Sequence, residues 1–373
     1  MFAVRTKFVS SRRRLHIPTS MLALEVHRYG PNLAGVGLND SRRVPTITRP
    51  DEMLVQVHAS SVNPIDLRFS EGYGRTTMNF VRRLQGQTSD ELPRVLGRDC
   101  TGVVQSIGTK VTKFQPGDKI WAAPEPSRQG CHSEFAIIRE NEAARKPSNL
   151  SWTDAASLPY VALTTWQALI RGAGLDSVRM PGKRVFVMGG SGGIGSFAIQ
   201  IIKAWGGHVT TTCSSSAVTF VRDLGADVVI DYTLDDSTEA LVSLPSFDVV
   251  FHTIGDDSAA RHLKVKSGGT FVSISNPFLS TVDQRGLVQG LACAMKAWGR
   301  KAFQERVRNG VNYRWEFFKP NFKALEIVAS LVEKEKIKPI VQSVHPFSEG
   351  LNAYQELADG HTRGKIVIEM KRS

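Results

Sequence analysis

The chain has 373 residues, of which 41% are hydrophobic and 22% charged, and its formal net charge at pH 7 is +12. The length predicts about two domains, and the composition excludes an intrinsically disordered chain. No run of about 18 apolar residues occurs, so no transmembrane helix is predicted. The cysteines, at positions 100, 131, 213 and 293, lack metal-ligand spacing and argue against a disulfide framework.

The N-terminal segment is basic and rich in hydroxyl side chains, and no acidic residue precedes Glu25. Its cations are Arg5, Lys7, Arg12, Arg13 and Arg14. No apolar stretch of the kind found in secretory signals follows the arginines. This pattern is typical of a mitochondrial transit peptide, which we predict over residues 1–20 together with a location in the mitochondrial matrix. A solvated basic tail is the alternative interpretation.

The next part of the chain is predicted to be rich in β-strands. Met53–Ala59 alternates apolar and polar residues as a half-buried strand does, and Asn63-Pro64 ends it. Val103–Val104 and Lys119–Trp121 are further candidate strands, and the segment 115–118 between them has turn residues. The polar stretch from Ser70 to Arg94 is predicted to be a loop.

From residue 184 onward, apolar strands alternate with helical segments, which predicts βαβ units and a parallel sheet. The predicted strands are Arg184–Met188, His208–Thr212, Val228–Ile230, Phe247–Phe251, Thr270–Ile274 and Tyr313–Phe318. Helices are expected over 154–170, 193–205, 217–224 and 323–336, whereas 277–312 is basic and less regular. A strand–helix–strand segment, 340–370, is expected to rejoin the first domain. The domains predicted are 21–165 with 335–373, and 166–334.

One motif carries the cofactor prediction. Gly190–Gly195 matches G-x-G-x-x-G, directly after a strand and at the start of a helix. In that context the glycines allow a tight turn and close approach to a pyrophosphate, which the helix N-terminus attracts. A structural Gly-rich turn is the weaker alternative. The motif therefore predicts a dinucleotide-binding site.

The end of the second strand selects between the two nicotinamide dinucleotides. NAD enzymes usually place an acid there to bind a ribose hydroxyl, but this chain has Ser214 and Ser215. Hydroxyls can donate to a 2′-phosphate that a carboxylate would repel, so the predicted cofactor is NADPH. A serine that caps a helix is the alternative, and both roles can coexist.

Several further motifs are spread along the chain. They are Ser61–Asp66, Val95–Val104, Gln115–Asp118, Ala155–Pro159, Leu163–Trp166, Arg222–Tyr232, Tyr313–Phe318, His361–Lys365 and Gly364–Ile368. Together with the glycine loop they resemble the zinc-free quinone-oxidoreductase branch of the medium-chain dehydrogenase/reductase superfamily, and in particular the mitochondrial reticulon-interacting-protein group of NADPH oxidoreductases. The resemblance covers roughly residues 22–370.

The resemblance implies an α/β protein with a Rossmann doubly wound parallel sheet domain and a GroES-like β-rich catalytic domain, with the active site in the cleft of that fold. Zinc members have a ligand cysteine where this chain has Asn63, and Gly-His-Glu where it has Gly97-Arg98-Asp99. The cysteine cluster of a structural zinc site is also missing. A zinc ion needs three or four ligands held together, so no metal is expected.

The resemblance also implies which residues surround the cofactor. The glycine-loop residues Ser191, Gly192, Gly193 and Ile194 are expected at the pyrophosphate, and Ser214, Ser215 and Tyr232 at the adenine end. Ile274, Glu316, Phe318 and Lys319 are expected at the nicotinamide pocket, and Thr362, Arg363 and Gly364 in a segment that folds back over the cofactor. Each of these residues has packing or surface exposure as its alternative. Relatives often have a lysine where this chain has Ala217 and Val218, so phosphate recognition departs from their pattern.

The reaction implied is hydride transfer from NADPH to a quinone or a related conjugated carbonyl, for which an aligned donor and a polarised acceptor suffice. Asn63 and Tyr73 are the candidate catalytic residues, with a turn asparagine and a packed tyrosine as their alternatives. An enoyl-thioester reductase and a non-catalytic NADPH-binding scaffold are rival functions. No nucleic-acid partner is predicted. The basic segment Lys296–Arg308 suits an anionic partner or a membrane surface, or is a solvated face, and a homodimer is compatible with the resemblance.

Overall fold

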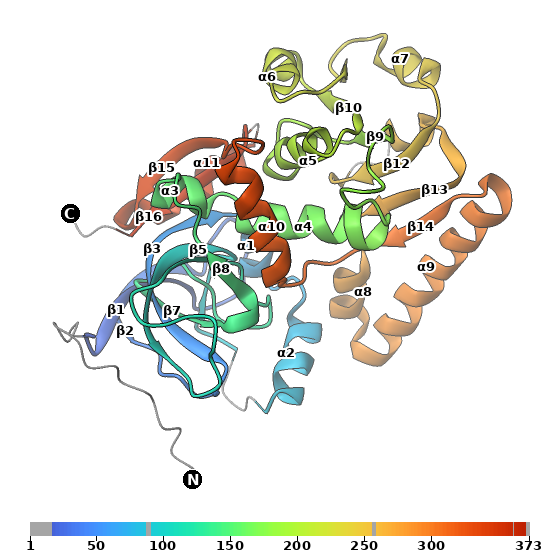
Figure 1. The fold of residues 1–373 in the computed structure, drawn as a ribbon. Coiled ribbons are helices and arrows are strands. Elements are labelled where there is room, and N and C mark those ends of the chain that lie inside the picture. Colours follow the sequence, from blue (N-terminus) through green and yellow to red (C-terminus); the bar gives the residue numbers. More distant parts are fainter. Residues whose placement is uncertain (1–16, 87–90, 256–258, 361, 371–373) are drawn as a thin grey trace. The chain divides into compact units, whose positions relative to one another are not determined.

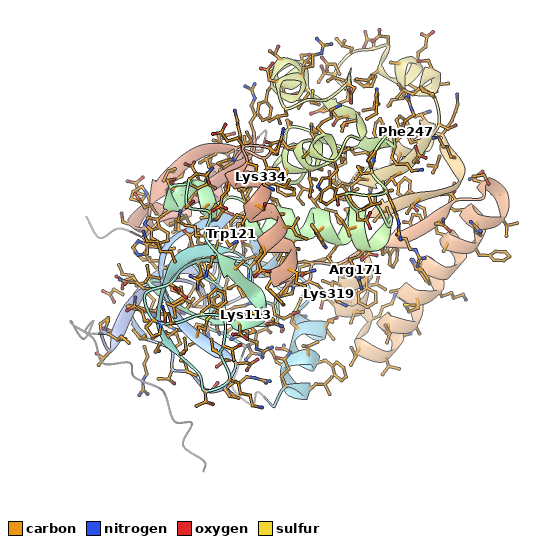
Figure 2. The ribbon with its side chains drawn as sticks, in the orientation of Figure 1. Lys113, Trp121, Arg171, Phe247, Lys319 and Lys334 are labelled. Atoms are coloured by element: carbon orange, nitrogen blue, oxygen red, sulfur yellow. The ribbon has the colours of Figure 1, made fainter. Side chains whose placement is uncertain are left out.

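The computed structural model describes residues 17–86, 91–255, 259–360 and 362–370. Most of the predicted transit peptide lies outside the described residues. Contacts divide the chain into two compact units. Unit 1 comprises residues up to Tyr160 with Pro320–Glu333 and Val341–Ser373, and unit 2 comprises Val161–Lys319 with Lys334–Ile340. Trp121 in unit 1 and Phe247 in unit 2, both labelled in Figure 2, are completely buried and mark the two cores.

The described part of unit 1 holds two sheets. The smaller one has the order β2-β1-β4, with β1 Ser20–Val26, β2 Val36–Arg43 and β4 Arg94–Val95. The larger one has the order β15-β16-β3-β5-β6-β8, with β7 paired to β3. Its strands are β3 Glu52–Val62, β5 Cys100–Ile107, β6 Lys119–Ala122, β7 Phe135–Arg139, β8 Ala143–Arg145, β15 Val341–Pro346 and β16 Lys365–Glu369. The final strand thus lies inside the sheet, between β15 and β3.

Helices cover these sheets at several places. α1 (Pro64–Ser70) begins directly after β3 because Asn63 and Pro64 form a helix start with proline in the first turn. The other helices of unit 1 are α2 Arg75–Leu84, η1 Glu140–Glu142, α3 Trp152–Ala156, α10 Phe322–Glu333, η5 Phe347–Glu349 and α11 Gly350–Asp359. The prediction of a loop from Ser70 to Arg94 is wrong over α2.

The described strands of unit 2 form one sheet of parallel strands in the order β11-β10-β9-β12-β13-β14. The strands are β9 Arg184–Val187, β10 His208–Cys213, β11 Val228–Asp231, β12 Phe247–His252, β13 Val265–Ser273 and β14 Asn312–Trp315. Counted along this unit, the order is 3-2-1-4-5-6, which defines a Rossmann sheet. Apolar residues such as Val185 and Phe186 are buried because helices cover both faces.

Unit 2 also contains the helices that connect these strands (Figure 1). They are α4 Pro159–Trp166, which begins at the end of unit 1, a π-helical turn Gln167–Gly172, α5 Gly193–Ala204, η3 Ser215–Ala217, α6 Val218–Asp223, α7 Ser237–Ser243, η4 Ala259–His262, α8 Phe278–Arg285 and α9 Leu287–Asn309. The segment 277–312, expected to be less regular, is therefore mostly helical. No described helix is both long and apolar enough to span a membrane.

The helix α10 groups with unit 1, although the sequence placed residues 323–334 in the dinucleotide-binding half. It packs on β8, and the Lys113 ammonium lies 2.8 Å from the centre of the Phe322 ring. Ser148 and Asn149 add hydrogen bonds to its C-terminal end, at Glu333 and the Val332 carbonyl. Helical periodicity reveals that α10 exists but not which of two cores its apolar side faces.

Candidate functional site

The glycine loop between β9 and α5 adopts a conformation that only glycine tolerates at three of its positions. Gly189 has a φ of 74°. A Cβ on Gly190 would lie 2.3 Å from Thr211 Oγ1, and one on Gly195 would lie 2.0 Å from the Gly189 carbonyl oxygen. The Gly190 N–H donates to the Thr212 carbonyl at 2.8 Å, which fixes the loop on β10. The loop is therefore a close-packed cradle rather than a slack connection.

This cradle presents hydrogen-bond donors. α5 begins at Gly193 after an extended Gly192, and the Ser196 N–H is the one that bonds back to the Gly192 carbonyl, at 2.9 Å. The amides before Ser196 have no acceptor within the helix and carry the positive end of its dipole. Ser191, Gly193 and Ile194 remain partly exposed beside them. These residues fit the pyrophosphate of a dinucleotide, at the switch point of the sheet between β9 and β12.

The turn after β10 carries the predicted adenine-end residues. The Ser214 hydroxyl lies 3.4 Å from that of Ser216, whereas the Ser215 hydroxyl donates to Asp231 Oδ2 at 2.5 Å. Thr233 also donates to Asp231, and the hydrogen bonds from Ser215 and Thr233 lower the pKa of this carboxyl below its usual range. Tyr232 is exposed next to it. An ionised acid thus lies beside the serine turn, at the end of β11 and not at the end of β10, where NAD enzymes usually have one.

The carboxyl ends of β12, β13 and β14 are tied together. His252 Nδ1 and the Ser273 hydroxyl are 2.9 Å apart, the Ile274 N–H donates to the His252 carbonyl, and the Glu316 N–H donates to the Ser273 carbonyl. These bonds bring Ile274 and Glu316, two of the predicted nicotinamide-side residues, to one edge of the sheet. The half-buried Phe318 and the exposed Lys319 follow Glu316 along the chain.

Glu316 lies among cations at this edge. Burial raises the pKa of its carboxyl, while Arg314, Lys319 and Arg171 act in the opposite direction. Figure 2 labels Arg171 and Lys319. Gly172, in the π-helical turn, allows Glu316 to approach closely, because a Cβ there would lie 2.8 Å from Glu316 Cγ. The edge can therefore present both charges and hydrogen-bond donors to a ligand.

In unit 1, Asn63 belongs to a buried polar cluster. The Lys365 ammonium donates to Asn63 Oδ1 at 2.6 Å and to the Val62 carbonyl at 2.7 Å. Asn63 Nδ2 donates to the Ser61 carbonyl at 3.2 Å. Asn63 is only 1% exposed, and both polar atoms of its side chain have partners. Its amide is held in one orientation and does not project as a free donor, which argues for positioning rather than direct contact with an acceptor.

Two carboxylates and a guanidinium complete this cluster. Asp99 accepts from the Ser61 amide and hydroxyl, at 3.0 and 2.8 Å. Asp66 accepts from the Gly97 amide at 3.0 Å and lies 3.6 Å from Arg98 Nε. Burial raises the pKa of Asp66 to about 6 and lowers the pKa of Lys365, whose neighbours Asp99 and Asp66 oppose that shift. The charges balance within the cluster.

A histidine and several tyrosines border the cluster. His132 Nε2 lies 3.3 Å from the Ser61 carbonyl, and its Nδ1 lies 2.9 Å from the Tyr354 hydroxyl. Burial lowers the pKa of His132 to about 3, so the ring is neutral. Burial raises the pKa of Tyr160, and the charges of Asp66 and Asp99 act in the same direction. The unpredicted Tyr160 lies beside the cluster, because its N–H donates to Asp99 Oδ2 at 3.4 Å. The predicted Tyr73 lies under the Arg68 guanidinium, whose central carbon is 5.4 Å from the centre of the tyrosine ring.

The C-terminal candidate residues directly precede β16. Thr362 Oγ1 is buried without a hydrogen-bond partner among the described residues, and the Arg363 N–H donates to Gln342 at 2.6 Å. Gly364 has a φ of 76°, which turns the chain into the strand that carries Lys365. A buried hydroxyl without a partner is a group that a bound ligand can satisfy.

Sequence reasoning missed Lys365, Tyr160, His132 and Asp231. The signal for Asp231 was available, because Val228–Asp231 reads as a strand that ends on an acid at the same edge as Ser214. Lys365 gives no local signal. Its partner Asn63 is 302 positions away along the chain, and a lysine before an apolar strand is otherwise taken as a surface residue.

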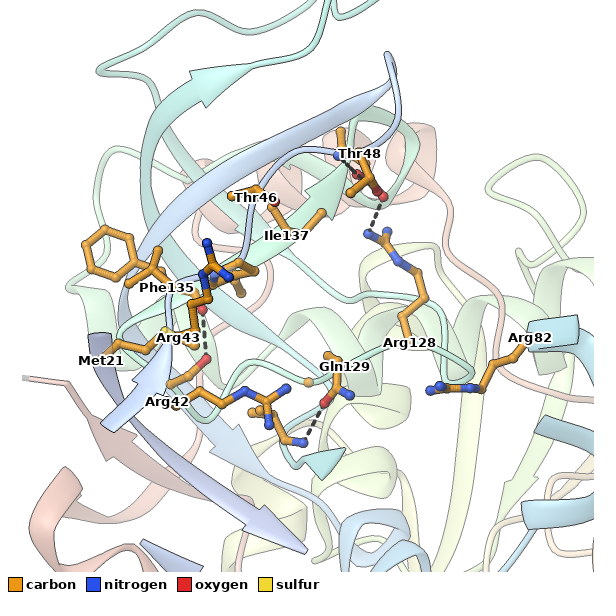
Figure 3. Close-up of a pocket in the computed structure, with 17 residues that line it drawn as sticks. Met21, Arg42, Arg43, Thr46, Thr48, Arg82, Arg128, Gln129, Phe135 and Ile137 are labelled. Atoms are coloured by element: carbon orange, nitrogen blue, oxygen red, sulfur yellow. Dashed lines mark hydrogen bonds and ion pairs between the residues drawn. The ribbon is translucent and has the colours of Figure 1, made fainter. Parts of the chain in front are cut away.

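A cavity of about 510 Å³ also lies in unit 1, lined by none of the predicted site residues. Arg82 and Arg128 are drawn at it in Figure 3. Arg128 is ion-paired to Glu52 at 3.0 Å and to Glu142 at 2.8 Å, so its charge is already compensated. We therefore assign the candidate site to the glycine-loop edge and the Asn63 cluster and not to this cavity.

A Rossmann sheet with a glycine loop at its switch point, joined to a β-rich domain, defines a medium-chain dehydrogenase/reductase. Family models confirm this class: the alcohol dehydrogenase GroES-like domain matches residues 49–149, and the zinc-binding dehydrogenase model matches residues 224–368. The chain belongs to the medium-chain dehydrogenase/reductase superfamily and is an oxidoreductase that binds a nicotinamide cofactor.

Particular relatives narrow the comparison. The mitochondrial NAD(P)H oxidoreductase RTN4IP1 of Mus musculus is 43% identical, with 94% of this chain and 90% of that protein covered. The mitochondrial reticulon-4-interacting protein 1 of Caenorhabditis elegans is 34% identical over 91% of this chain and 93% of its own length. A chloroplastic quinone-oxidoreductase homolog of Spinacia oleracea is 30% identical, with 86% and 90% covered. The chain is thus of the NAD(P)H and quinone oxidoreductase type.

Solved structures show the same fold. A quinone oxidoreductase from Coxiella burnetii superposes with a TM-score of 0.74 at 27% identity and covers 94% of this chain and 99% of its own. An alcohol dehydrogenase superfamily protein from Novosphingobium aromaticivorans has the same TM-score at 26% identity, with 94% and 100% covered. The predicted fold class and superfamily are confirmed.

The name of one matching family model includes zinc, but the residues at the candidate catalytic position do not fit that ion. Asn63 Oδ1 is bound to an ammonium, and Arg98 is a permanent cation that is fully buried beside Asp66. Zinc ligands are thiolate, imidazole or carboxylate groups with free lone pairs. Lys365 and Arg98 already balance the charges of Asp66 and Asp99, so a divalent cation would leave the cluster with excess positive charge.

Proposed function

We propose that this oxidoreductase transfers a hydride from NADPH to a quinone or a related conjugated carbonyl. The observation that carries the proposal is the combination of a dinucleotide cradle at the glycine loop with a charge-balanced cluster in place of zinc ligands. An acceptor that needs no Lewis acid suits such a site, because a quinone takes up hydride readily and water can supply the proton. The names of relatives from chloroplasts and from Coxiella support the same class of acceptor.

Each part of the chain has a defined task in this proposal. The first amides of α5, with Ser191 and Gly192, bind the pyrophosphate, and Ser214 donates to the 2′-phosphate. The nicotinamide pocket is lined by Ile274, Glu316, Phe318 and Lys319. The cofactor, when bound, supplies the hydride. Thr362 Oγ1 offers a buried donor. Lys365 holds the Asn63 amide fixed, and Tyr73 is the residue that we assign to hydrogen bonding with the acceptor oxygen.

The test is steady-state turnover of the purified full chain with NADPH and a panel of water-soluble quinones, with an enoyl thioester in parallel. We expect quinone-dependent loss of NADPH absorbance that a metal chelator does not reduce, and metal analysis without stoichiometric zinc. Faster turnover of the enoyl thioester would instead identify an enoyl-thioester reductase. Binding of NADPH without turnover of any acceptor would identify a scaffold.

We further propose that the enzyme works in the mitochondrial matrix and that residues 1–20 direct it there. The relatives named above as mitochondrial support this location, together with the acid-free arginine cluster of the N-terminus. Fluorescent fusions of the full chain and of a chain without residues 1–20 test it. The full chain should enter mitochondria and the shortened one should stay in the cytosol, and import of both would contradict the proposal.

A further inference from the structure

The helix α9 presents an apolar side to solvent. It packs against α8 and β14, with Gly290 and Ala294 buried on its inner side (Figure 1). The outer side carries five large hydrophobic residues, and we call this surface the α9 face. Their exposed fractions are 83% for Val288, 43% for Leu291, 48% for Met295, 71% for Phe303 and 65% for Val307.

These residues lie on one side of the helix. At 3.6 residues per turn their directions fall within an arc of roughly 160°. A helix on the surface of a globular protein normally turns its apolar stripe inward and its polar side outward. α9 turns Lys301 inward instead, where its ammonium lies 4.8 Å from the centre of the Tyr313 ring. Large apolar side chains that are exposed on one side of a helix mark a candidate contact site.

The charges exposed on α9 have one sign. Lys296, Arg300, Arg306 and Arg308 are exposed. At 3.6 residues per turn, Lys296 and Arg306 point in directions within the arc of the apolar residues, and Arg300 lies next to it. The acid of the helix, Glu305, is half-buried and accepts a hydrogen bond from Asn309 at 2.8 Å. The α9 face therefore combines apolar side chains with uncompensated positive charge.

We propose that the α9 face docks on an anionic lipid surface, with the helix axis parallel to the membrane. Such a surface takes up apolar side chains between its headgroups and attracts the flanking cations at the same time. A symmetric pairing of two α9 helices would bring the cations of one copy against those of the other, with no exposed α9 acid to pair with them. Charge complementarity thus selects the lipid surface, and the inference does not depend on the identity of the electron acceptor.

Co-sedimentation with vesicles tests this proposal on the full chain. The probes are vesicles of phosphatidylcholine alone and vesicles in which about one third is phosphatidylglycerol. We expect binding to the anionic vesicles only, and a loss of binding as added salt screens the cations. Equal binding to both compositions, or no binding to either, would overturn the proposal.

Matched substitutions locate the contact. Val307→Ser should lower the partition coefficient roughly three- to tenfold, because a valine side chain no longer enters the headgroup region. Val178→Ser changes another exposed valine elsewhere in unit 2 and should have no effect. Lys296→Gln should lower the coefficient by about fivefold, since one cation is lost. Lys334→Gln, at another exposed lysine, is its control.

A second copy of the chain is the competing occupant, and it predicts different results. Sedimentation velocity would then show a dimer that Val307→Ser dissociates, and the anionic vesicles would compete with dimer formation or fail to bind. That outcome would replace the lipid proposal. Equal vesicle binding by Val307→Ser, Lys296→Gln and the wild type would also overturn it, because the contact would then lie outside the α9 face.

Discussion

At the scale of single residues, the buried ammonium of Lys365 controls the geometry of the Asn63 cluster. It bonds Asn63 Oδ1 and the end of β3, and its charge faces the carboxylates of Asp99 and Asp66. When one charged partner of a buried ion pair is removed, the other charge is left buried without a partner. The loss of stability is then larger than the stabilisation that the pair itself contributes. The cluster is thus a rigid support for the residues around it.

The residue that we expect to tune cofactor choice is Asp231. Its ionised carboxylate lies beside the serine turn, so it opposes a 2′-phosphate there. Asp231→Asn should tighten NADPH binding about two- to fivefold, in the range of an exposed charge interaction, and leave NADH binding unchanged or weaker. The dissociation constants for both cofactors measure this effect, with Asp235→Asn as the control at a nearby exposed acid.

Ser214 gives the opposite arm of the same experiment. Ser214→Asp adds a carboxylate where the phosphate is expected and should shift preference toward NADH, while loss of one hydrogen bond to a charged group costs roughly 10–100-fold in affinity. If Asp231→Asn and Ser214→Asp each bind NADPH and NADH with wild-type affinity, this turn does not contact the phosphate.

His132 predicts a pH effect on stability. Its folded pKa of about 3 lies below the usual histidine pKa of 6.5, so between these values the unfolded chain holds a proton that the folded chain does not. Acidification through this window therefore costs stability, by about 1.4 kcal/mol for each pH unit. Asp66, with a folded pKa of about 6 against 3.8, acts in the opposite direction over part of the window.

The comparison of His132→Gln with the wild type isolates the histidine. At pH 7 the variant should have a lower free energy of unfolding than the wild type. This difference should be smaller by about 2 kcal/mol at pH 5, because the variant has no imidazole to protonate. Urea unfolding at the two pH values, followed through the transition of unit 1, measures the difference between variant and wild type. Tyr354→Phe removes the hydrogen bond to His132 Nδ1 but keeps the His132 imidazole, so the stability difference between this variant and the wild type should not shrink at pH 5. A constant deficit for His132→Gln would contradict this account.

At the scale of elements, local patterns predicted the parallel sheet and missed several helices, among them α2 and α9. β9 and β12 are short apolar runs next to turn residues, and β10 is a short run of valine and threonine, so strands and the glycine loop could be placed from neighbouring residues alone. α9 was missed because its outer side is apolar and its inner side carries glycine, alanine and Lys301, which obscures the helical period. α2 begins after Gly74, which offers no side-chain cap, and six of its ten residues are polar.

The same limit applies to the candidate site. Glycine-loop residues could be predicted because the motif is contiguous in sequence. The Asn63 cluster could not, since it joins β3, α1, β16 and the segment around His132, and each contact depends on strand pairing over long sequence separations. Tyr160 likewise reaches Asp99, 61 positions away along the chain, only in the folded protein.

Glycines in two helices should respond differently to alanine. Gly195→Ala in α5 places a methyl group 2.0 Å from the Gly189 carbonyl oxygen, so the loop must shift and dinucleotide binding should be lost. Gly299→Ala in α9 meets no atom within 4 Å and should raise stability by about 0.5–1 kcal/mol. Calorimetry of NADPH binding and thermal unfolding measure both, and normal binding by Gly195→Ala would refute the cradle.

At the scale of the whole molecule, the chain leaves unit 1 after Tyr160 and returns to it twice, at Pro320 and at Val341. Unit 2 is consequently an insertion within unit 1. The sequence predicted the same two kinds of domain along the chain but assigned α10 to the dinucleotide-binding domain. The apolar residues of unit 1 are distributed over three separated stretches, so its core cannot form from the N-terminal residues alone.

This insertion makes a truncation informative. A chain that ends at Gly364 lacks β16, whose Ile366, Val367 and Ile368 are buried between β15 and β3. We expect unit 2 to resist protease in this variant and unit 1 to be degraded. A chain that ends at Met370 retains the strand and serves as the control. Equal resistance of unit 1 in both chains would show that the last strand is dispensable.

The position of β16 also sets an order for biosynthesis. A ribosome releases the amino end first, so β3 and Asn63 emerge long before the strand and the lysine that complete them. During that interval the open edge of β3 is exposed to pairing with other strands. Unit 2 is fully synthesised by residue 340 and can fold while unit 1 still waits. A chain that is released amino end first therefore completes its nucleotide cradle before its catalytic half, and β3 needs shielding until β16 follows.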